Sequence, residues 1–249
     1  MKTILFAKRN TKEILRDPLN LFFALGFPLV LLLLFYIINN AIPEEANNTL
    51  FSIENTAPGL ATFGTAFFAL FSGMLVSKDR TSSFLMRLFT SPMKATNYLL
   101  GYTLPLILMA IVQSCITFIS AIILGLPFII NILLSIITVI PISLLFIGIG
   151  LLCGSFLNDK AVGGICGALL TNIAGWFSGV WIPLELIGGV FKQIALILPF
   201  YHSVEVGKLV LNGSFSSILP HIGIVLIYAI IVYGLAIVIF NKKMHDGTV

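Results

Sequence analysis

Residues 128–157 have the sequence FIINILLSIITVIPISLLFIGIGLLCGSFL, which contains no Asp, Glu, Lys or Arg. A helix crosses the hydrocarbon core of a bilayer with roughly 20 apolar residues, so this stretch predicts a membrane span. Five other stretches are equally free of charge, and every charged residue of the chain lies between or around the six. The predicted spans are Leu19–Ile38, Leu60–Ser77, Tyr98–Leu124, Phe128–Leu157, Ala161–Ile182 and Ile218–Phe240.

The composition of the whole chain agrees with this pattern. The 249 residues are 58% hydrophobic and 10% charged, with a mean hydropathy of +1.08, whereas soluble domains carry roughly 25% charged residues. The chain is therefore predicted to be an all-α polytopic membrane protein with six transmembrane helices, in one domain spanning residues 1–249. The first apolar run is longer than the 7–15 residues of a signal-peptide core, and we expect it to remain as an anchor.

The distribution of basic residues predicts the orientation. When both termini are placed on one side, 12 of the 14 lysines and arginines fall on that side, and only Lys192 and Lys208 fall on the other. Basic connections are retained in the cytoplasm, so we expect a multi-pass protein of the cell membrane with both termini cytoplasmic. Anionic lipid accounts for the location of this positive charge, and no nucleic-acid partner is implied.

The segment 1–18 is predicted to be an interfacial helix. Ile4 and Leu15 fall near one helical face and Lys8 and Arg16 on another, a pattern typical of helices that lie in the headgroup layer. Because the residue before a proline is disfavoured in the α conformation, the chain should turn at Asp17-Pro18. Pro28 is expected to kink the first span.

The segment 183–216 on the outer side is too apolar for an ordinary loop. Its stretches Leu184–Gly189 and Phe191–Leu198 predict short re-entrant helices. His202 and Glu205 are three residues apart in this segment, but two ligands do not make a zinc site, so structural roles are expected for both. The three cysteines lie inside predicted spans, where buried thiols are expected.

The loop 78–97 is the longest on the side of the termini. Phe84 and Leu88 belong to an apolar stripe, and Arg80, Ser83 and Arg87 to a polar one, which predicts an amphipathic helix that ends near Ser91. Such a helix can lie on the membrane surface and simply join two spans. It can also dock a cytoplasmic partner, and periodicity does not distinguish these roles.

Three parts of the chain resemble ABC-2 type permeases, the membrane half of one class of ABC exporters. The first is the start of the chain with Arg16-Asp17-Pro18 and Pro28. The second is the loop with Asp79-Arg80, Leu85, Arg87-Leu88-Phe89 and Ser91-Pro92, and the third runs from Ser178-Gly179 through Pro183-Leu184-Glu185 and Leu198-Pro199-Phe200-Tyr201 to Gly213. The chain departs from the family pattern at Ser83-Phe84, at Met86 and at Ile187–Gly189.

The resemblance implies a mechanism. Such permeases work in the bacterial cell membrane as two copies, or two paralogues, surrounded by lipid and driven by two cytoplasmic ABC ATPases. The ATPase-coupling residues implied here are Arg80, Ser83, Phe84, Arg87, Leu88 and Ser91. The chain contains no G-x-x-x-x-G-K-[ST] phosphate loop, so we expect no cofactor, metal or catalytic residue in it, and ATP with Mg²⁺ on the partner.

By analogy with the family, spans one, two and five would line the path between two permeases. The candidate residues for the path or the permease interface are Phe22, Phe23, Phe67, Phe71, Gly175, Trp176, Phe177 and Gly179. An apolar wall favours a hydrophobic or amphipathic cargo, such as a drug, an antimicrobial peptide or a lipid-like molecule. The glycine pairs Gly150/Gly154, Gly163/Gly167 and Gly175/Gly179 allow close helix approach, within one subunit or between subunits.

The sequence leaves two other functions open. A pore or lipid scramblase that needs no nucleotide is one alternative to the ATP-driven exporter. A membrane-embedded enzyme is another, although the sequence shows no convergent set of nucleophile, base and metal ligands. Ion coupling has little support, because the spans offer mainly Gln113 and Asn172 as polar groups. For these two residues, interhelical hydrogen bonds are expected.

Overall fold

The computed structural model describes residues 2–43, 50–82, 84 and 94–246, and this part of the chain contains helices and no strands. The chain is an all-α polytopic membrane protein, as predicted. The elements before the long helix α7 are α1 (Lys2–Leu15), α2 (Pro18–Leu21), the π-helical η1 (Phe22–Gly26), α3 (Phe27–Ala41), α4 (Ile53–Phe63), η3 (Gly64–Ala66) and α5 (Phe67–Thr81). The later elements are α7 (Ala95–Ile123), α8 (Asn131–Phe156), α9 (Asp159–Val162), the π-helical η4 (Gly163–Leu169), α10 (Leu170–Phe177), α11 (Leu184–Ile187), α12 (Gly189–Ile197), α13 (Pro199–Leu211), η5 (Phe215–Ser217) and α14 (Ile218–Asp246).

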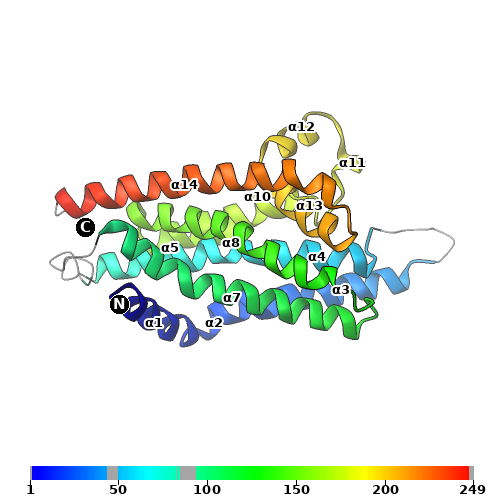
Figure 1. Cartoon of the computed structure of the whole chain (residues 1–249), viewed down its shortest axis with the longest axis horizontal. Helices are drawn as coiled ribbons and strands as arrows, with labels where there is room; N and C mark the ends of the chain where they lie inside the picture. The colour runs from blue at the N-terminus through cyan, green and yellow to red at the C-terminus, as the bar shows by residue number, and fades with distance from the viewer. Residues whose placement is uncertain (1, 44–49, 83, 85–93, 247–249) are drawn as a thin grey trace.

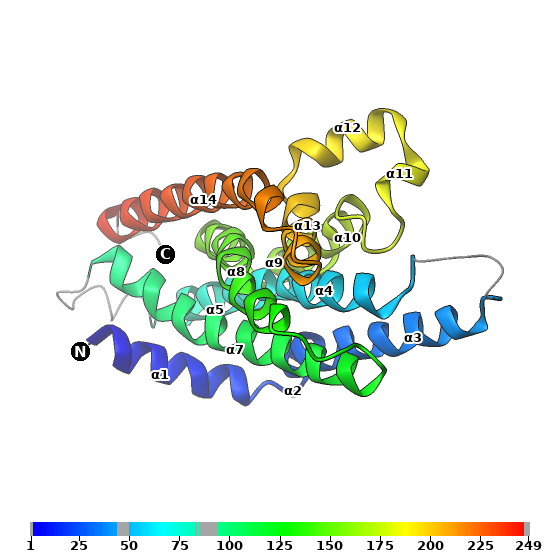
Figure 2. The same ribbon diagram turned by 45° about the vertical axis from the view of Figure 1, so that its right-hand side comes forward.

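The long helices form one bundle (Figure 1). Helix α1 and the end of α14 lie at the same end of it, which we call the terminal end, and α11, α12 and α13 lie toward the opposite, far end (Figures 1 and 2). Within the described residues, five helices are long and apolar enough to cross a membrane. A sixth is added if α12 and α13, which are bent by 79° at their junction, count as one span.

The fifth predicted span differs from the expectation. The stretch Ala161–Ile182 is helical only up to Phe177, and its helix begins earlier, at Asp159, and passes through η4. At about 1.5 Å per residue this helix is about 28 Å long, close to the thickness of a hydrocarbon core. It is not among the five candidate spans, since Asp159, Lys160 and Asn172 lower its hydropathy.

Proline and aspartate shape the start of the chain as predicted. Helix α1 ends at Leu15, and Asp17 adopts an extended conformation before Pro18. The side chain of Asp17 then caps α2 by accepting a hydrogen bond from the backbone of Asn20 (3.1 Å). Pro28 follows the wide π-helical turn η1, and because proline lacks an N–H, the regular α-helical bond at this position cannot form.

The far end contains short helices in the predicted places. Helices α11 and α12 occupy the two apolar stretches predicted to be helical. The connection between them turns at Gly188 and Gly189, whose φ values are +64° and +57°. This left-handed conformation suits glycine, which has no Cβ to clash.

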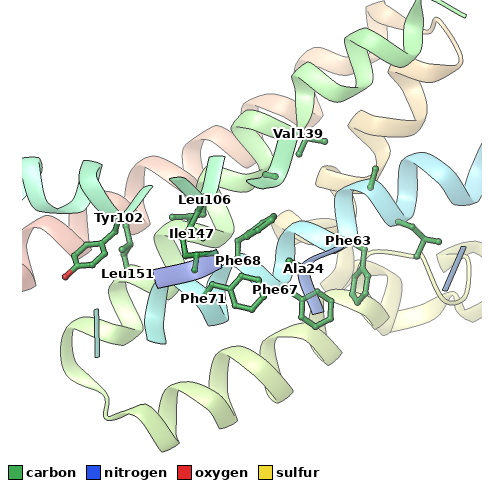
Figure 3. Packing of buried hydrophobic residues seen from close by; sticks show 14 of the residues in the cluster. Ala24, Phe63, Phe67, Phe68, Phe71, Tyr102, Leu106, Val139, Ile147 and Leu151 are labelled. Atoms are coloured by element: carbon green, nitrogen blue, oxygen red, sulfur yellow. The ribbon is translucent and has the colours of Figure 1, made fainter. Parts of the chain in front are cut away.

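The span formed by α4, η3 and α5 is the centre of the bundle. Of its most apolar stretch 89% is buried, against 17% for the span that contains α14. Its phenylalanines Phe63, Phe67, Phe68 and Phe71 pack in a row along the core, where Ala24, Leu106, Ile147 and Leu151 from three other helices surround them (Figure 3). The bundle is therefore built around one buried helix and has lipid-facing helices at its edge.

Helices α5 and α8 approach each other closely because glycine lies at their crossing. A Cβ added to Gly150 would overlap the carbonyl oxygen of Ala69 and the hydroxyl of Ser72, and one at Gly154 would lie 2.5 Å from the carbonyl oxygen of Gly73. The close approach lets Ser72 donate a hydrogen bond to the carbonyl of Ile147 (3.0 Å). The first predicted glycine pair therefore packs within one subunit.

The other glycine pairs differ from one another. Among the described residues, no heavy atom lies within 4 Å of a Cβ placed on Gly163, whereas a Cβ on Gly167 would contact the side chain of Leu70. Gly175 packs under the indole ring of Trp181, and Gly179 has a φ of +75° at the turn that follows α10.

We expect Gly150→Ala to destabilise the bundle. The new methyl group would collide with backbone atoms of α5, which cannot move aside as a flexible side chain can, and overpacking of this kind costs about 1–3 kcal/mol. Thermal unfolding in detergent micelles should show a lowered Tm for this variant. The matched control is Gly163→Ala, which places the same methyl group in open space. An equal Tm for the two variants would contradict the close α5–α8 crossing.

Candidate functional site

Helix α1 packs against α7 at the terminal end. Its buried residues Phe6, Ala7, Asn10 and Ile14 lie on one face. The ring of Phe6 makes edge-to-face contacts with Tyr98 and Tyr102, whose centroids lie 5.8 Å and 4.9 Å away. Of the residues predicted to share an apolar face, Ile14 is buried here, whereas Ile4 and Leu15 are exposed.

A polar contact fixes the same helix to α7. Asn10 is fully buried and donates a hydrogen bond to the carbonyl oxygen of Gly101 (3.0 Å). A Cβ on Gly101 would overlap the ring of Phe6, so glycine at this position permits the packing. Helix α1 is thus packed into the bundle.

A buried ion pair joins α1 to the end of α5. The guanidinium of Arg9 donates two hydrogen bonds to the carboxylate of Asp79, at 2.5 Å and 2.6 Å, and the hydroxyl of Tyr102 donates a third at 2.8 Å. Asp79 is only 2% exposed, so its charge depends on these three donors. We call Arg9, Asp79 and Tyr102 the Arg9–Asp79 cluster.

The cluster extends to the start of the predicted coupling loop. The guanidinium of Arg9 lies over the ring of Phe84, 4.5 Å from its centroid, within the range of a cation–π contact. Arg9 also pairs with Glu13 at 2.7 Å. Burial opposes the charge of Arg9, but its hydrogen bonds to Asp79 and its attraction to both carboxylates outweigh burial and raise its pKa. Burial raises the pKa of Glu13.

Arg80 contacts α8 and the turn that follows it. Its two terminal nitrogens donate to the carbonyl oxygens of Ser155 (3.2 Å) and Leu157 (2.5 Å). These carbonyls lie at the C-terminal end of a helix, where they lack intrahelical donors and a cation is favourable. One turn earlier, Ser77 donates to Asp159 at the start of the next helix. The end of α5 is therefore fixed on two sides, by Arg9 and by Arg80.

The structure describes only part of the predicted coupling set. Phe84 lies under the guanidinium of Arg9, and Arg80 contacts the end of α8. The positions Ser83, Arg87, Leu88 and Ser91 lie outside the described residues.

The predicted path residues do not form a single surface in one chain. Phe67 and Phe71 are buried in the core, and Phe23 stacks on Phe67 with 5.8 Å between ring centroids. Phe22 and Trp176 are about half exposed on the outside of the bundle. Phe177 stacks on Phe191 of α12 (4.4 Å), which joins the end of α10 to the re-entrant helices.

Trp181, which the sequence analysis did not single out, contacts residues of three helices at the far end. Its indole lies against Gly175 of α10 and makes edge-to-face contacts with Phe35 of α3 (6.3 Å) and Phe63 of α4 (5.7 Å). One aromatic side chain thus connects the first, second and fifth predicted spans. The sequence offered one signal, which was a tryptophan two residues after a glycine at the end of a span.

The predicted interhelical hydrogen bonds of Gln113 and Asn172 were wrong. Gln113 donates to Thr117 in its own helix (3.2 Å), and Asn172 donates to the carbonyl of Ala168, also in its own helix (2.7 Å). The amide oxygen of Gln113 is buried without a hydrogen-bond partner among the described residues. Asn172 is exposed on the outside of the bundle.

The burial of the cysteines mostly agrees with the prediction. Cys153 and Cys166 are buried, and Cys115 is half-buried. The described residues contain no cluster of three or more His, Cys, Asp or Glu side chains that could hold a metal ion. His202 does not pair with Glu205. Its partner is His221, 19 residues further along the chain.

Comparison with known proteins identifies the class. The family model described as ABC-2 type transporter matches residues 1–210, and the chain belongs to this family. It is therefore a membrane permease component of an ABC transporter, and the family association implies an ABC ATPase partner. No curated protein matched the chain. The matched region contains the whole Arg9–Asp79 cluster.

Proposed function

We propose that the chain is the permease subunit of an ATP-driven exporter in the bacterial cell membrane. Separate cytoplasmic ATPase subunits, two in number, hold ATP and Mg²⁺, and a second copy or a paralogue completes the permease. The cargo is a hydrophobic or amphipathic molecule. The terminal end, which carries 12 of the 14 basic residues, faces the cytoplasm.

One observation carries this proposal. The Arg9–Asp79 cluster lies at the basic end of the bundle, where it joins the first helix to the end of α5 and, through Phe84, to the start of the loop 78–97. A motor that moved this loop would therefore pull on α1 and on the central helix together. A passive pore has no need for such a mechanical connection between a cytoplasmic loop and the most buried helix.

The packing of α5 supports a transmission role. Its terminal end is fixed by Arg9 and by Arg80, and its middle is close-packed on α8 at Gly150. Because close-packed interiors transmit displacement and do not absorb it, a shift of the loop would reach the core of the bundle. At the far end of the same span, Phe63 contacts Trp181.

The test compares the chain with and without its motor. The tagged chain is purified from membranes of its host in mild detergent, and any co-purifying ABC ATPase is identified and reconstituted with it in liposomes. We expect ATP-dependent movement of a fluorescent amphiphilic dye and a change in ATP hydrolysis when permease and ATPase are combined. Liposomes with the chain alone should show neither.

The alternative function gives the opposite result in the same assay. A pore or a scramblase would release the dye, or equilibrate a fluorescently labelled phospholipid between leaflets, in liposomes that contain the chain and no ATPase. An ATPase that co-purifies but leaves its hydrolysis rate and the flux unchanged would also count against the exporter.

A further inference from the structure

The junction between α12 and α13 at the far end leaves helix-terminal carbonyls that need donors. Helix α12 ends at Ile197, Leu198 is extended, and α13 begins with Pro199, which has no N–H. The carbonyl groups in the last turn of a helix have no intrahelical donor. In a membrane protein such groups are costly unless other parts of the protein satisfy them.

Two side chains supply these donors. The Nε2 atom of His202 lies 2.8 Å from the carbonyl oxygen of Leu196, and the hydroxyl of Tyr228 on α14 donates to the carbonyl oxygen of Ile197 at 3.1 Å. The other ring nitrogen of His202, Nδ1, lies 2.8 Å from Nδ1 of His221, also on α14. His202 is only 6% exposed. The two histidines thus connect the re-entrant helices α12 and α13 to α14.

These distances determine the tautomers. A carbonyl oxygen can only accept, so Nε2 of His202 must carry a proton. In the neutral imidazole, Nδ1 of His202 is then an acceptor, and Nδ1 of His221 must donate to it. His221 is therefore protonated on Nδ1 and has its lone pair on Nε2. The two rings are in opposite tautomers, each fixed by its partner.

The hydrogen bond between the two rings can persist with one added proton but not with two. A first added proton binds at Nε2 of His221, and the bond from its Nδ1 to His202 persists and becomes charge-assisted. A second proton would have to bind at Nδ1 of His202. Two N–H groups would then face each other at 2.8 Å between two positive rings, and the bond would break. Imidazole is the side chain that ordinarily changes charge between pH 5 and 8.

We propose that His202 and His221 form a one-proton latch at the far end of the bundle, which joins the junction of α12 and α13 to α14 with zero or one added proton and opens with two. The latch is independent of the cluster at the terminal end. Opening breaks the hydrogen bond between the two histidines, while the apolar contacts between α13 and α14 and the bond from Tyr228 to Ile197 remain, so the freedom gained is that of α12.

The charged and titratable neighbours belong to three elements. Tyr201 and Glu205 flank His202 on α13, with Lys208 3.8 Å from Glu205. Helices α11 and α12 contribute Glu185 and Lys192, whose charged atoms lie 3.9 Å apart. Helix α14 contributes Tyr228.

Nitrogen-15 NMR of histidine tests the latch directly, because the chain has only three histidines. The full chain with His245→Gln, labelled with ¹⁵N-histidine in lipid nanodiscs, is titrated from about pH 8 to pH 5. We expect opposite neutral tautomers, then one proton at Nε2 of His221, and a second uptake only at distinctly lower pH. Identical tautomers, or two independent titrations at the same pH, would overturn the proposal.

Spin labels measure the release itself. Labels are placed at the exposed positions Val190 on α12 and Leu219 on α14, in a chain whose three cysteines are alanine. The distribution of distances between the two labels should stay unchanged while the first proton binds and should broaden when the second one binds.

Two variants at one position separate the latch from general acid effects. His221→Gln keeps the contact at every pH, because an amide can donate to neutral His202 or turn and accept from its charged form. It should therefore hold the distance constant across the titration. His221→Leu removes the hydrogen-bond partner of His202, so the distribution of label-to-label distances should be broad at all pH values. The latch would be refuted if the distance distribution of the glutamine variant broadened at low pH as in the wild type. It would also be refuted if the distribution of the leucine variant stayed as narrow as that of the wild type at high pH.

Discussion

Exchanging Asp79 for asparagine should lower the stability of the permease by about 3 kcal/mol and disconnect α1 from α5. Asp79 is almost fully buried and receives three hydrogen bonds, two of them from the guanidinium of Arg9. Removing one partner of a buried ion pair leaves the other charge uncompensated, at a cost of about 3–5 kcal/mol. We expect the lower end of this range because the side chain of Arg9 is 36% exposed, so water can partly solvate its charge.

A double-mutant cycle separates the ion pair from other effects. Arg9→Gln combined with Asp79→Asn removes both charges, so the double variant should be more stable than the sum of the two single losses predicts. Thermal unfolding of the purified chain in detergent supplies the four values. Glu54→Gln, which neutralises an exposed carboxylate at the far end, is the control and should leave Tm unchanged. Strictly additive losses would show that the two charges do not interact.

The same variant should also affect transport if the cluster transmits motion. With the co-purified ATPase bound, Asp79→Asn should leave association intact and reduce the change in ATP hydrolysis on complex formation by about tenfold, equivalent to roughly 1.4 kcal/mol of lost coupling. Normal coupling in a destabilised but assembled variant would restrict the cluster to a structural role.

Arg87→Glu is expected to weaken association with the ATPase by at least about tenfold. The variant puts a negative charge on the polar stripe of the predicted coupling helix, where the ATPase is expected to meet a positive one. Like charges that face each other at an interface cost several kcal/mol. Leu88→Glu should have a similar effect for a different reason, because it puts a carboxylate on the apolar stripe that faces the membrane. Co-purification of the ATPase and its hydrolysis rate measure both variants.

The control for this pair is Lys192→Glu, which makes the same type of charge reversal at the far end of the bundle. It should leave ATPase association unchanged, and membrane insertion should be normal in all three variants. Unaltered association in both Arg87→Glu and Leu88→Glu would reduce the loop 78–97 to a connection on the membrane surface.

Much of the fold follows from charge and periodicity. The charge-free stretches predicted the long helices because lipid excludes charge and requires backbone hydrogen bonds within a helix. Asp17-Pro18 predicted the break after α1 from local sterics alone. The π-helical turn within the fifth predicted span could not be found in this way, since charge and periodicity do not show how η4 packs against α5.

The contacts of the candidate site were less predictable. Asp79 lies two residues after an apolar span, but Arg9 is 70 residues away in the chain and any of several basic residues could have filled the role. The same holds for His202, whose neighbour in sequence is Glu205 but whose partner in space is His221. Pairings across distant elements require the packing of the helices, and one sequence does not contain it.

The described residues contain two π-helical turns, and both lie outside the central helix of the bundle. A wide turn holds one more residue than an α-helical turn, so its conversion to α-helix rotates everything beyond it by about 100° around the helix axis. The central helix and α8, close-packed at Gly150, contain no such turn. Both the first span, at Phe22–Gly26, and the helix Asp159–Phe177, at Gly163–Leu169, contain one. Conversion of either turn would therefore move Phe35 of the first span, or Gly175 of α10, away from the indole ring of Trp181.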